Sequence, residues 1–145
     1  MTRYEIDEWM NEAARASDRE RNDVAYDVVK NLYYAFSKTV GDDIASDILY
    51  TLAGSIIGSS GESELSYPVF DLLARAFGVR LSKSEFFDAL VKHSSDREMN
   101  CLRRAIGSLN DNGKRDLVTF ACMIYACDGR ITQREKEFMY GLILG

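Results

Sequence analysis

Proline, histidine and cysteine are scarce in this 145-residue chain, and each scarcity excludes a class of structure or site. A single proline leaves nearly every backbone N–H able to donate within a helix, which is typical of a mostly helical protein. The only histidine, His93, argues against a His-based catalytic triad and against a metal site built from several histidines. Three cysteines without a C-x-x-C spacing, Cys101, Cys122 and Cys127, predict buried thiols in a reducing compartment.

Long apolar runs and a surplus of basic residues are missing as well. No apolar run approaches the ~20 residues that span a bilayer, so direct membrane insertion is not expected. The first 30 residues are charged throughout, which argues against a secretory signal. The 23 acidic residues outnumber the 18 basic ones and give a net charge of −5, whereas nucleic-acid binders normally carry a basic face. We therefore expect a cytoplasmic protein that binds no nucleic acid.

Apolar residues recur with helical spacing along almost the whole chain, and alternation of period two is nearly absent. No linker interrupts the pattern, so the sequence predicts one all-α domain over residues 1–145, a compact bundle of about seven or eight helices. A charged first helix is expected over 3–16, followed by a polar break over 17–22. The residues expected on the buried sides of the helices are Tyr4, Ile6, Trp9, Met10, Ala13, Ala25, Val28, Val29, Leu32, Phe36, Ile44, Ile48, Leu52, Ile56, Val69, Leu72, Leu73, Ala76, Phe77, Phe86, Phe87, Leu90, Val91, Met99, Leu102, Ile106, Leu109, Leu117, Phe120, Ala121, Ile124, Phe138, Met139 and Leu142.

Polar residues mark the expected helix starts. Asp42 or Asp43 is expected to cap the third helix and Ser66 the fourth, and Asn112-Gly113 is expected to break the chain before the seventh. Three Ser/Thr-x-x-Glu motifs predict capping boxes, in which each residue's side chain bonds the other's backbone N–H. They are Ser82–Glu85, Ser95–Glu98 and Thr132–Glu135.

Motifs for covalent or phosphate chemistry are incomplete. In the segment from Gly54 to Gly58 the serine is misplaced for a nucleophile elbow and no strand precedes it. Residues 58–61 do not continue into the Gly-Lys-Ser/Thr of a phosphate loop. Because Gly54 and Gly58 lie one helical turn apart, close packing of a neighbouring helix explains them more simply. Without a supported general base, we do not expect an enzyme.

The segment from Thr39 to Ala74 contains no lysine or arginine but six acidic residues. One interpretation is a solvated helix face together with helix caps. The other is an acidic surface for divalent cations or for a basic partner. The candidate partner-binding residues are Asp42, Asp43, Asp47, Glu62 and Glu64.

An Asp-Gly loop follows the expected helix that ends near Cys127. Asp128, Gly129 and Glu135 have the spacing of the second half of an EF-hand loop, in which Glu135 would be a bidentate ligand. The first half is missing, because Ile124 and Ala126 cannot bind calcium through their side chains, so a true EF-hand is excluded. The capping box of Glu135 explains the same residues without a metal.

A weaker copy of this pattern lies 68 residues earlier, around Gly61. Both glycines follow an apolar helix and precede a capped helix with an apolar side. This predicts a pseudo-duplicated helix–loop–helix unit. In the first copy Ser60 stands where Asp128 stands, and Val69 stands where Glu135 stands.

The second copy resembles the signature of the TerB-like (tellurite resistance) domain family through Ala126, Asp128, Gly129, Ile131, Glu135 and Phe138. The resemblance covers about residues 24–145 and leaves 1–22 as an extra N-terminal helix. It implies an all-helical, cytoplasmic, non-enzymatic domain that is linked to stress response and acts through protein partners. It also implies a divalent cation (calcium, magnesium or manganese) at Asp128 and Glu135, with Glu62 or Glu64 contributing.

Two hypotheses follow from these observations. The first is a TerB-like binding domain. The alternative is a small acidic inhibitor or immunity-type protein that covers a basic partner with its Thr39–Ala74 face. Self-association is left open in both.

Overall fold

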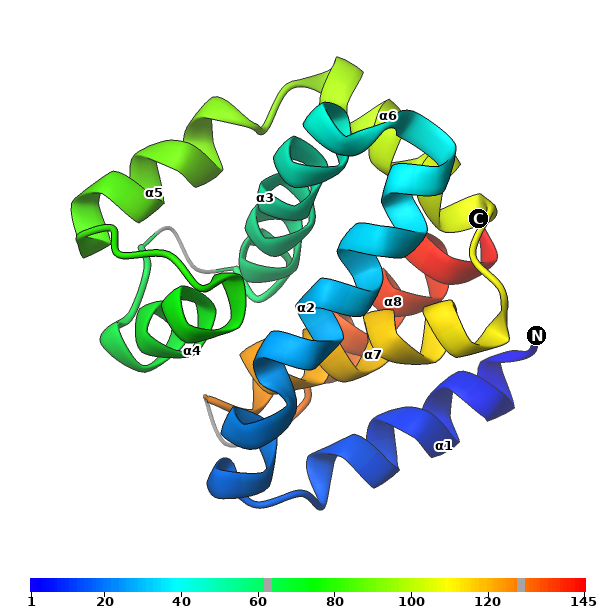
Figure 1. Cartoon of the computed structure of the whole chain (residues 1–145). Helices are drawn as coiled ribbons and strands as arrows, with labels where there is room; N and C mark the ends of the chain where they lie inside the picture. Colours follow the sequence, from blue (N-terminus) through cyan, green and yellow to red (C-terminus); the bar gives the residue numbers. More distant parts are fainter. Residues whose placement is uncertain (62–63, 128–129) are drawn as a thin grey trace.

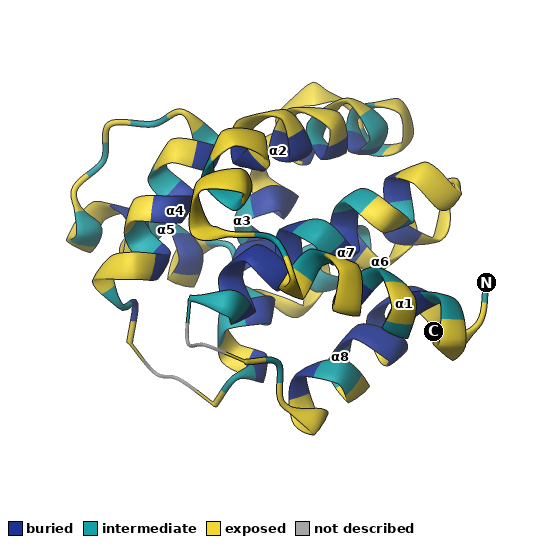
Figure 2. Ribbon diagram, turned by 90° about the horizontal axis from the view of Figure 1, so that it is seen from below, coloured by how far each residue is buried: buried dark blue, intermediate teal, exposed yellow. Residues whose placement is uncertain are grey.

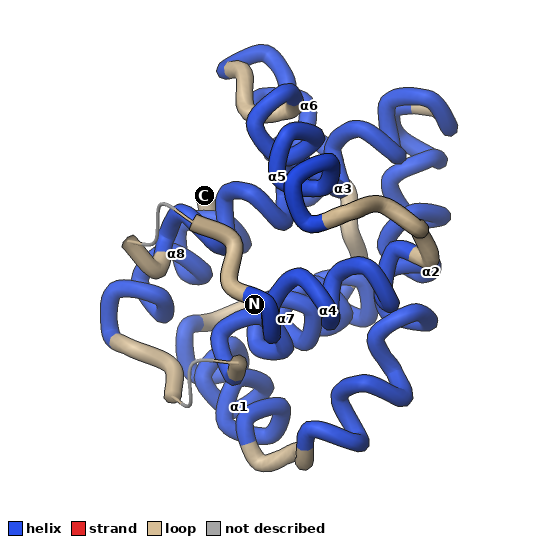
Figure 3. The backbone as a smooth tube through the Cα atoms, turned by 90° about the vertical axis from the view of Figure 1, so that its left-hand side faces the viewer, coloured by secondary structure: helices blue, strands red, loops and turns tan. Residues whose placement is uncertain are grey.

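Eight α-helices and no strand make up the part of the chain that the structure describes. The structure is a computed structural model, and it describes residues 1–61, 64–127 and 130–145. The expected all-α bundle of seven or eight helices is confirmed (Figure 3). The helices are α1 (Arg3–Ala14), α2 (Asp18–Val40), α3 (Asp42–Ser59), α4 (Tyr67–Phe77), α5 (Lys83–Lys92), α6 (Asp96–Gly107), α7 (Asp111–Ala126) and α8 (Gln133–Leu144).

Helices α2 and α7 cross at the centre of the bundle (Figure 1). Helix α2 packs against α3, α4, α6 and α7, and α7 also contacts α1, α3, α4 and α8. Buried residues face this centre and exposed ones face outward (Figure 2). None of the helices in the described ranges has both the length and the apolar character needed to cross a membrane.

Helix α1 is part of the core. Its residues Ile6 and Met10 are fully buried, as the apolar pattern predicted. Its outer side is tied to α7 by Arg115, whose Nη2 donates to both carboxylate oxygens of Glu12 at 2.9 and 2.8 Å. Because the buried residues anchor it, α1 cannot be removed without exposing α7.

Helix α2 begins earlier than the sequence predicted. The polar break expected over 17–22 is wrong, because Ser17 and Glu20 form a capping box and the helix starts at Asp18. The expected N-terminal helix over 1–22 is therefore two elements, α1 and the first turn of α2. A capping box can lie within a run of charged residues, and such a run alone does not mark a loop.

The expected chain break at Asn112-Gly113 is also wrong. Helix α7 starts at Asp111, and the side chain of Asn110 accepts the backbone N–H of Gly113 at 2.8 Å. Gly113 is buried in the first helical turn, where a Cβ would come within 2.9 Å of Leu109. This glycine therefore serves close packing within a helix.

The predicted capping boxes at Ser82–Glu85 and Thr132–Glu135 are confirmed. At α6, Ser95 accepts the backbone N–H of Glu98, but no reciprocal bond from the Ser95 N–H forms. The position of Ser66 as N-cap is confirmed, although its side chain makes no capping hydrogen bond.

The expected capping of α3 by Asp42 or Asp43 is wrong. The N-cap is Gly41, which has a positive φ of 86°, and no side chain bonds the first turn. Both aspartates lie in that turn, where the positive end of the helix dipole favours a carboxylate.

Four residues expected on buried sides are exposed. The exposed fractions are 70% for Tyr4, 44% for Ile44, 37% for Phe87 and 56% for Val91. Phe87 and Val91 lie one turn apart on α5, so together they leave one apolar strip uncovered.

Replacing Tyr140 by phenylalanine tests the contact between α1 and α8. The Tyr140 hydroxyl donates to Asp7, and burial together with this bond raises the pKa of Tyr140 to about 12. We expect Tyr140→Phe to lower the free energy of unfolding at pH 7 by about 1–3 kcal/mol. In the unfolded chain the pKa of a tyrosine is about 10, which is lower than that of Tyr140 in the folded protein. Tyr140 therefore stabilises the fold below pH 10 and loses this contribution as the pH rises towards 12. The variant's stability should therefore fall less steeply over that range.

Urea unfolding between pH 7 and 12 measures both effects. Tyr34→Phe is the matched control, because Tyr34 is more than half exposed. Equal losses in the two variants would contradict a specific role for the Tyr140–Asp7 bond.

Candidate functional site

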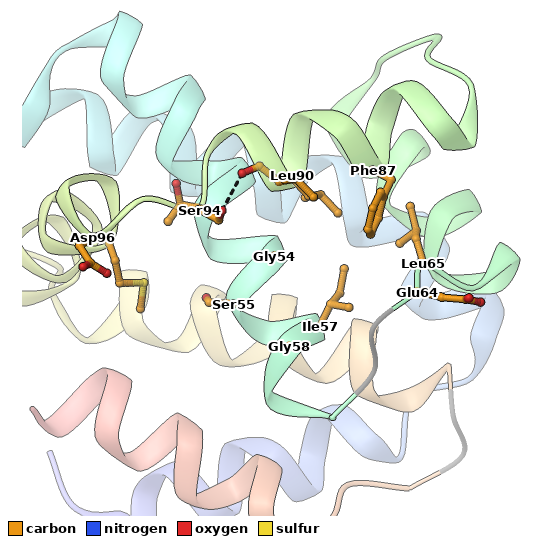
Figure 4. A pocket seen from close by; sticks show the side chains of 13 residues that line it. Gly54, Ser55, Ile57, Gly58, Glu64, Leu65, Phe87, Leu90, Ser94 and Asp96 are labelled. Atoms are coloured by element: carbon orange, nitrogen blue, oxygen red, sulfur yellow. Dashed lines mark hydrogen bonds between the residues drawn. The ribbon is translucent and has the colours of Figure 1, made fainter.

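An apolar groove lies between α3, α5 and the start of α6 (Figure 4). We call it the α3–α5 groove. Its hollow has a volume of about 320 Å³, and α3 contributes small residues to it, including Gly54, Ser55 and Gly58. The apolar side chains that line it are Ile57, Leu65, Phe87, Leu90, Val91 and Met99.

The two glycines of α3 have different roles in this groove. At Gly54 a Cβ would lie 3.7 Å from the Leu90 carbonyl oxygen, so the predicted close helix packing is confirmed there. At Gly58 it would meet no atom within 4 Å, so the same prediction is wrong at that position. Gly58, in the last turn of α3, lines the groove.

A carboxylate stands at each end of the groove. Asp96, the first residue of α6, lies at one end, and Glu64 lies at the other (Figure 4). Both residues are exposed, and the described residues that line the groove include no lysine or arginine. Beyond Glu64 a second hollow of about 360 Å³ continues past Phe87, and there the Lys83 ammonium lies 4.2 Å from the centre of the Tyr67 ring. The groove itself is therefore negatively charged.

His93 fixes the wall of the groove to its floor. Its carbonyl oxygen accepts the hydroxyl of Thr51 at 2.7 Å, which ties the end of α5 to α3. Its Nδ1 lies 2.6 Å from Glu98 of α6, and its Nε2 lies 3.7 Å from Asp47 of α3. The ring also stacks on Tyr50. His93 is thus a structural residue that joins the C-terminal end of α5 to α3 and α6.

A second polar cluster joins the α3–α4 loop to α8. The Ser60 hydroxyl donates to Oε2 of Glu135 at 2.6 Å, and Oε1 of Glu135 accepts the Thr132 N–H at 2.7 Å. Beside them the hydroxyls of Ser59 and Tyr125 lie 2.7 Å apart. Glu135 is only 3% exposed, so its carboxylate is buried with each oxygen hydrogen-bonded. The α3–α4 loop is therefore in direct contact with the start of α8.

The predicted cation site is only partly described. Asp128, Gly129 and Glu62 lie outside the described residues. Within the described ranges, no group of three or more His, Cys, Asp or Glu side chains is placed to hold a metal ion. Glu64 lines the α3–α5 groove, and Glu135 lies in the buried cluster with Ser60. Cation binding through Asp128 and Glu135 therefore stays a prediction.

The predicted partner-binding acids lie towards opposite ends of α3. Asp42, Asp43 and Asp47 lie in its first two turns, whereas Glu64 follows its C-terminal end. A helix of this length extends about 27 Å, which is more than two Debye lengths at physiological salt. The hollow beside Asp47 is also lined by Lys92 and Arg97, so basic residues from α5 and α6 offset its charge.

The cysteines belong to the helix packing. Burial, with a smaller contribution from Glu135, raises the pKa of the Cys122 thiol to about 12, so it stays protonated at neutral pH. Cys101 is half-buried and accepts a contact from Arg104 at 3.5 Å. Cys127 is also half-buried and donates to the Met123 carbonyl at 3.4 Å. The expected burial is therefore confirmed for Cys122, whereas Cys101 and Cys127 are only partly buried.

The sequence contained a signal for the groove that was not recognised. Helix α5 has only ten residues, yet Phe86, Phe87, Leu90 and Val91 give it an apolar side that is wide for its length. Phe86 and Leu90 are buried, and the other two are exposed. An apolar side wider than one neighbour can cover indicates either a deeply buried helix or a binding surface.

A comparison with protein-family models, with curated proteins and with solved structures finds no match for this chain. The resemblance to the TerB-like family thus depends on the residues of the Asp-Gly motif and on the repeat.

Two substitutions of Glu135 separate capping from cation binding. In Glu135→Gln the amide oxygen can still accept the Thr132 N–H and the amide group can donate to Ser60, so we expect a loss below about 1 kcal/mol. Glu135→Ala removes both bonds and should cost about 1–3 kcal/mol. If a cation binds weakly at Asp128 and Glu135, calcium, magnesium or manganese should raise the melting temperature of the wild type, and Glu135→Gln should abolish that rise.

Thermal unfolding followed by circular dichroism, with and without each cation, measures these effects. A rise that persists unchanged in Glu135→Gln and in Asp128→Asn would place the cation elsewhere. No rise in the wild type would leave capping as the role of Glu135.

Proposed function

We propose that this chain is a non-enzymatic helical binding domain, similar to TerB-like domains, that acts through a protein partner bound in the α3–α5 groove. The observation that carries the proposal is the pair of exposed apolar residues, Phe87 and Val91, along an apolar hollow with a small-residue floor. Exposed aromatic and aliphatic residues beside a pocket are typical of the central contacts in protein interfaces.

The resemblance adds a cytoplasmic location, a link to stress response and a divalent cation to this proposal. The Ser60 hydroxyl donates to Glu135, so the α3–α4 loop contacts the start of α8 beside the Asp-Gly motif that carries the resemblance. Because this cluster and the groove both include residues near the end of α3, a cation at Glu135 would stiffen the floor of the groove.

Filling the groove tests the proposed function. A Cβ at Gly58 would meet no atom of the described residues within 4 Å, so Gly58→Leu starts a side chain in open space beside the hollow, and a leucine favours the helix over glycine by about 0.5–1 kcal/mol. We expect this variant to melt no lower than the wild type but to lose its partner. The measurement is the set of proteins retained by the immobilised chain from an extract of its source cells.

Gly141→Leu is the matched control, because Gly141 also lies in a helix with no atom within 4 Å of a Cβ. It should retain the same proteins as the wild type. If Gly58→Leu retains them equally well, the groove is not the binding site and the proposal is wrong.

The alternative, an acidic inhibitor, is favoured by a different observation. Asp42 and Asp43 are exposed at the start of α3, in a segment without basic residues. We expect the double substitution Asp42→Lys and Asp43→Lys to slow association with a basic partner several-fold at low salt, because steering by these charges is lost. The difference from the wild type should shrink as the Debye length falls below ~10 Å.

Association rates measured by surface plasmon resonance at low and moderate salt test this alternative. The control substitutes Asp111 and Asn112, which are exposed in the first turn of α7, by lysine. Thermal melts of both variants show whether the fold is kept. Wild-type rates for the α3 variant at both salt concentrations would identify Asp42 and Asp43 as a solvated face.

A further inference from the structure

We infer that the occupant of the α3–α5 groove is an amphipathic α-helix with a basic residue at each end of its apolar side. This inference rests on the proposed function, and it specifies the chemistry of the partner. Four features of the groove lead to it: its length, its floor of small residues, its apolar wall and the signs of the charges at its ends.

The floor of the groove suits a short helix. It extends along α3 from Thr51 to Gly58, which corresponds to about 10 Å, or two helical turns. Gly54 is already packed against Leu90 of α5, but Ser55 and Gly58 carry a small side chain and none, so the backbone of a guest helix can approach this end of α3 closely. Two turns of a guest helix present apolar residues at positions i, i+3, i+4 and i+7.

The wall of the groove supplies the apolar contacts for these residues. Phe87 and Val91 are one turn apart and exposed, and Leu90 lies between them at the bottom of the hollow. A leucine on the guest that covers Phe87 and Val91 would remove the apolar strip of α5 from water. A guest without apolar residues would gain nothing from this surface.

The ends of the groove select the charge of the guest. Asp96 and Glu64 lie at opposite ends, and neither takes part in an ion pair with a described residue. Lys83, which lines the adjoining hollow, has its ammonium over the Tyr67 ring. A lysine or arginine at each end of the guest can therefore reach a carboxylate while its aliphatic stem covers Phe87 or Met99. Acidic ends on the guest would be repelled.

Labelled synthetic helices test the inference by fluorescence anisotropy with the full chain. The first peptide has leucines at i, i+3, i+4 and i+7 and a lysine at each end of this side, and the second has glutamates in place of the lysines. We expect the lysine peptide to bind about 2- to 30-fold more tightly, from two exposed ion pairs, and this ratio to fall at high salt. A third peptide with serines in place of the leucines should bind weakly or not at all.

Substitutions in the chain locate the charge effect. Asp96→Lys should remove or invert the preference for the lysine peptide at that end of the groove. Asp111→Lys is the matched control, because Asp111 is also exposed and is the first residue after its helix N-cap. Both substitutions remove a carboxylate from the positive end of a helix dipole, so they should lower the stability of the fold by similar amounts. A difference between the two variants in peptide preference therefore reports a role of Asp96 in the groove.

The outcomes separate this inference from the proposed function. Equal binding of the lysine and glutamate peptides overturns the inference, and so does a preference for the lysine peptide that is unchanged in Asp96→Lys. Either result leaves the proposed function standing if Gly58→Leu loses the partner protein. Peptide binding that Gly58→Leu leaves intact overturns both. If sedimentation shows a dimer that Gly58→Leu converts to a monomer, a second copy of the chain occupies the groove and the inference is wrong.

Discussion

The burial of α7 is the constraint on which the rest of the structure depends. Its residues from Leu117 to Tyr125 are buried with the single exception of Thr119, so the helix is apolar on almost every side. Such a helix is stable only when it is covered all round. Helices α1, α2, α3, α4 and α8 provide this cover, and burial of each large side chain contributes roughly 1.5–3 kcal/mol. The arrangement of these five helices follows from this requirement, whereas α5 and α6 pack on the helices that cover α7.

Hydrogen bonds explain why the carboxylate of Glu135 is tolerated inside the protein. A buried carboxylate is costly unless its oxygens are hydrogen-bonded, and Ser60 and Thr132 supply those bonds. Ser60 lies at the end of α3 and Thr132 at the start of α8. The buried carboxylate of Glu135 therefore connects two helices that both pack against α7. The groove lies on the other side of α3, where α5 is left with an apolar strip that no helix covers.

The helical fold could be predicted well from the sequence, because the buried stripes of α2, α4 and α7 repeat at helical spacing and need no knowledge of their neighbours. Helix starts were less certain. Polar residues 17–22 suggested a break, and Asn112-Gly113 suggested another, although Ser17 and Asn110 cap helices at those places. The exposure of Phe87 and Val91 could not be predicted, since it depends on which helix lies beside α5 and where that helix ends. Proximity in sequence likewise suggested one acidic surface, whereas α3 separates Asp42 from Glu64.

The attachment of α1 has a consequence for how the chain folds. Its partners Arg115 and Tyr140 are 103 and 133 residues away from Glu12 and Asp7, respectively. During synthesis α1 is therefore made long before the surface that covers Ile6 and Met10 exists. Contacts so distant in sequence slow folding, and an amphipathic helix without its partner is prone to aggregate. The nascent chain thus carries its first helix without these partners until α7 and α8 have been translated.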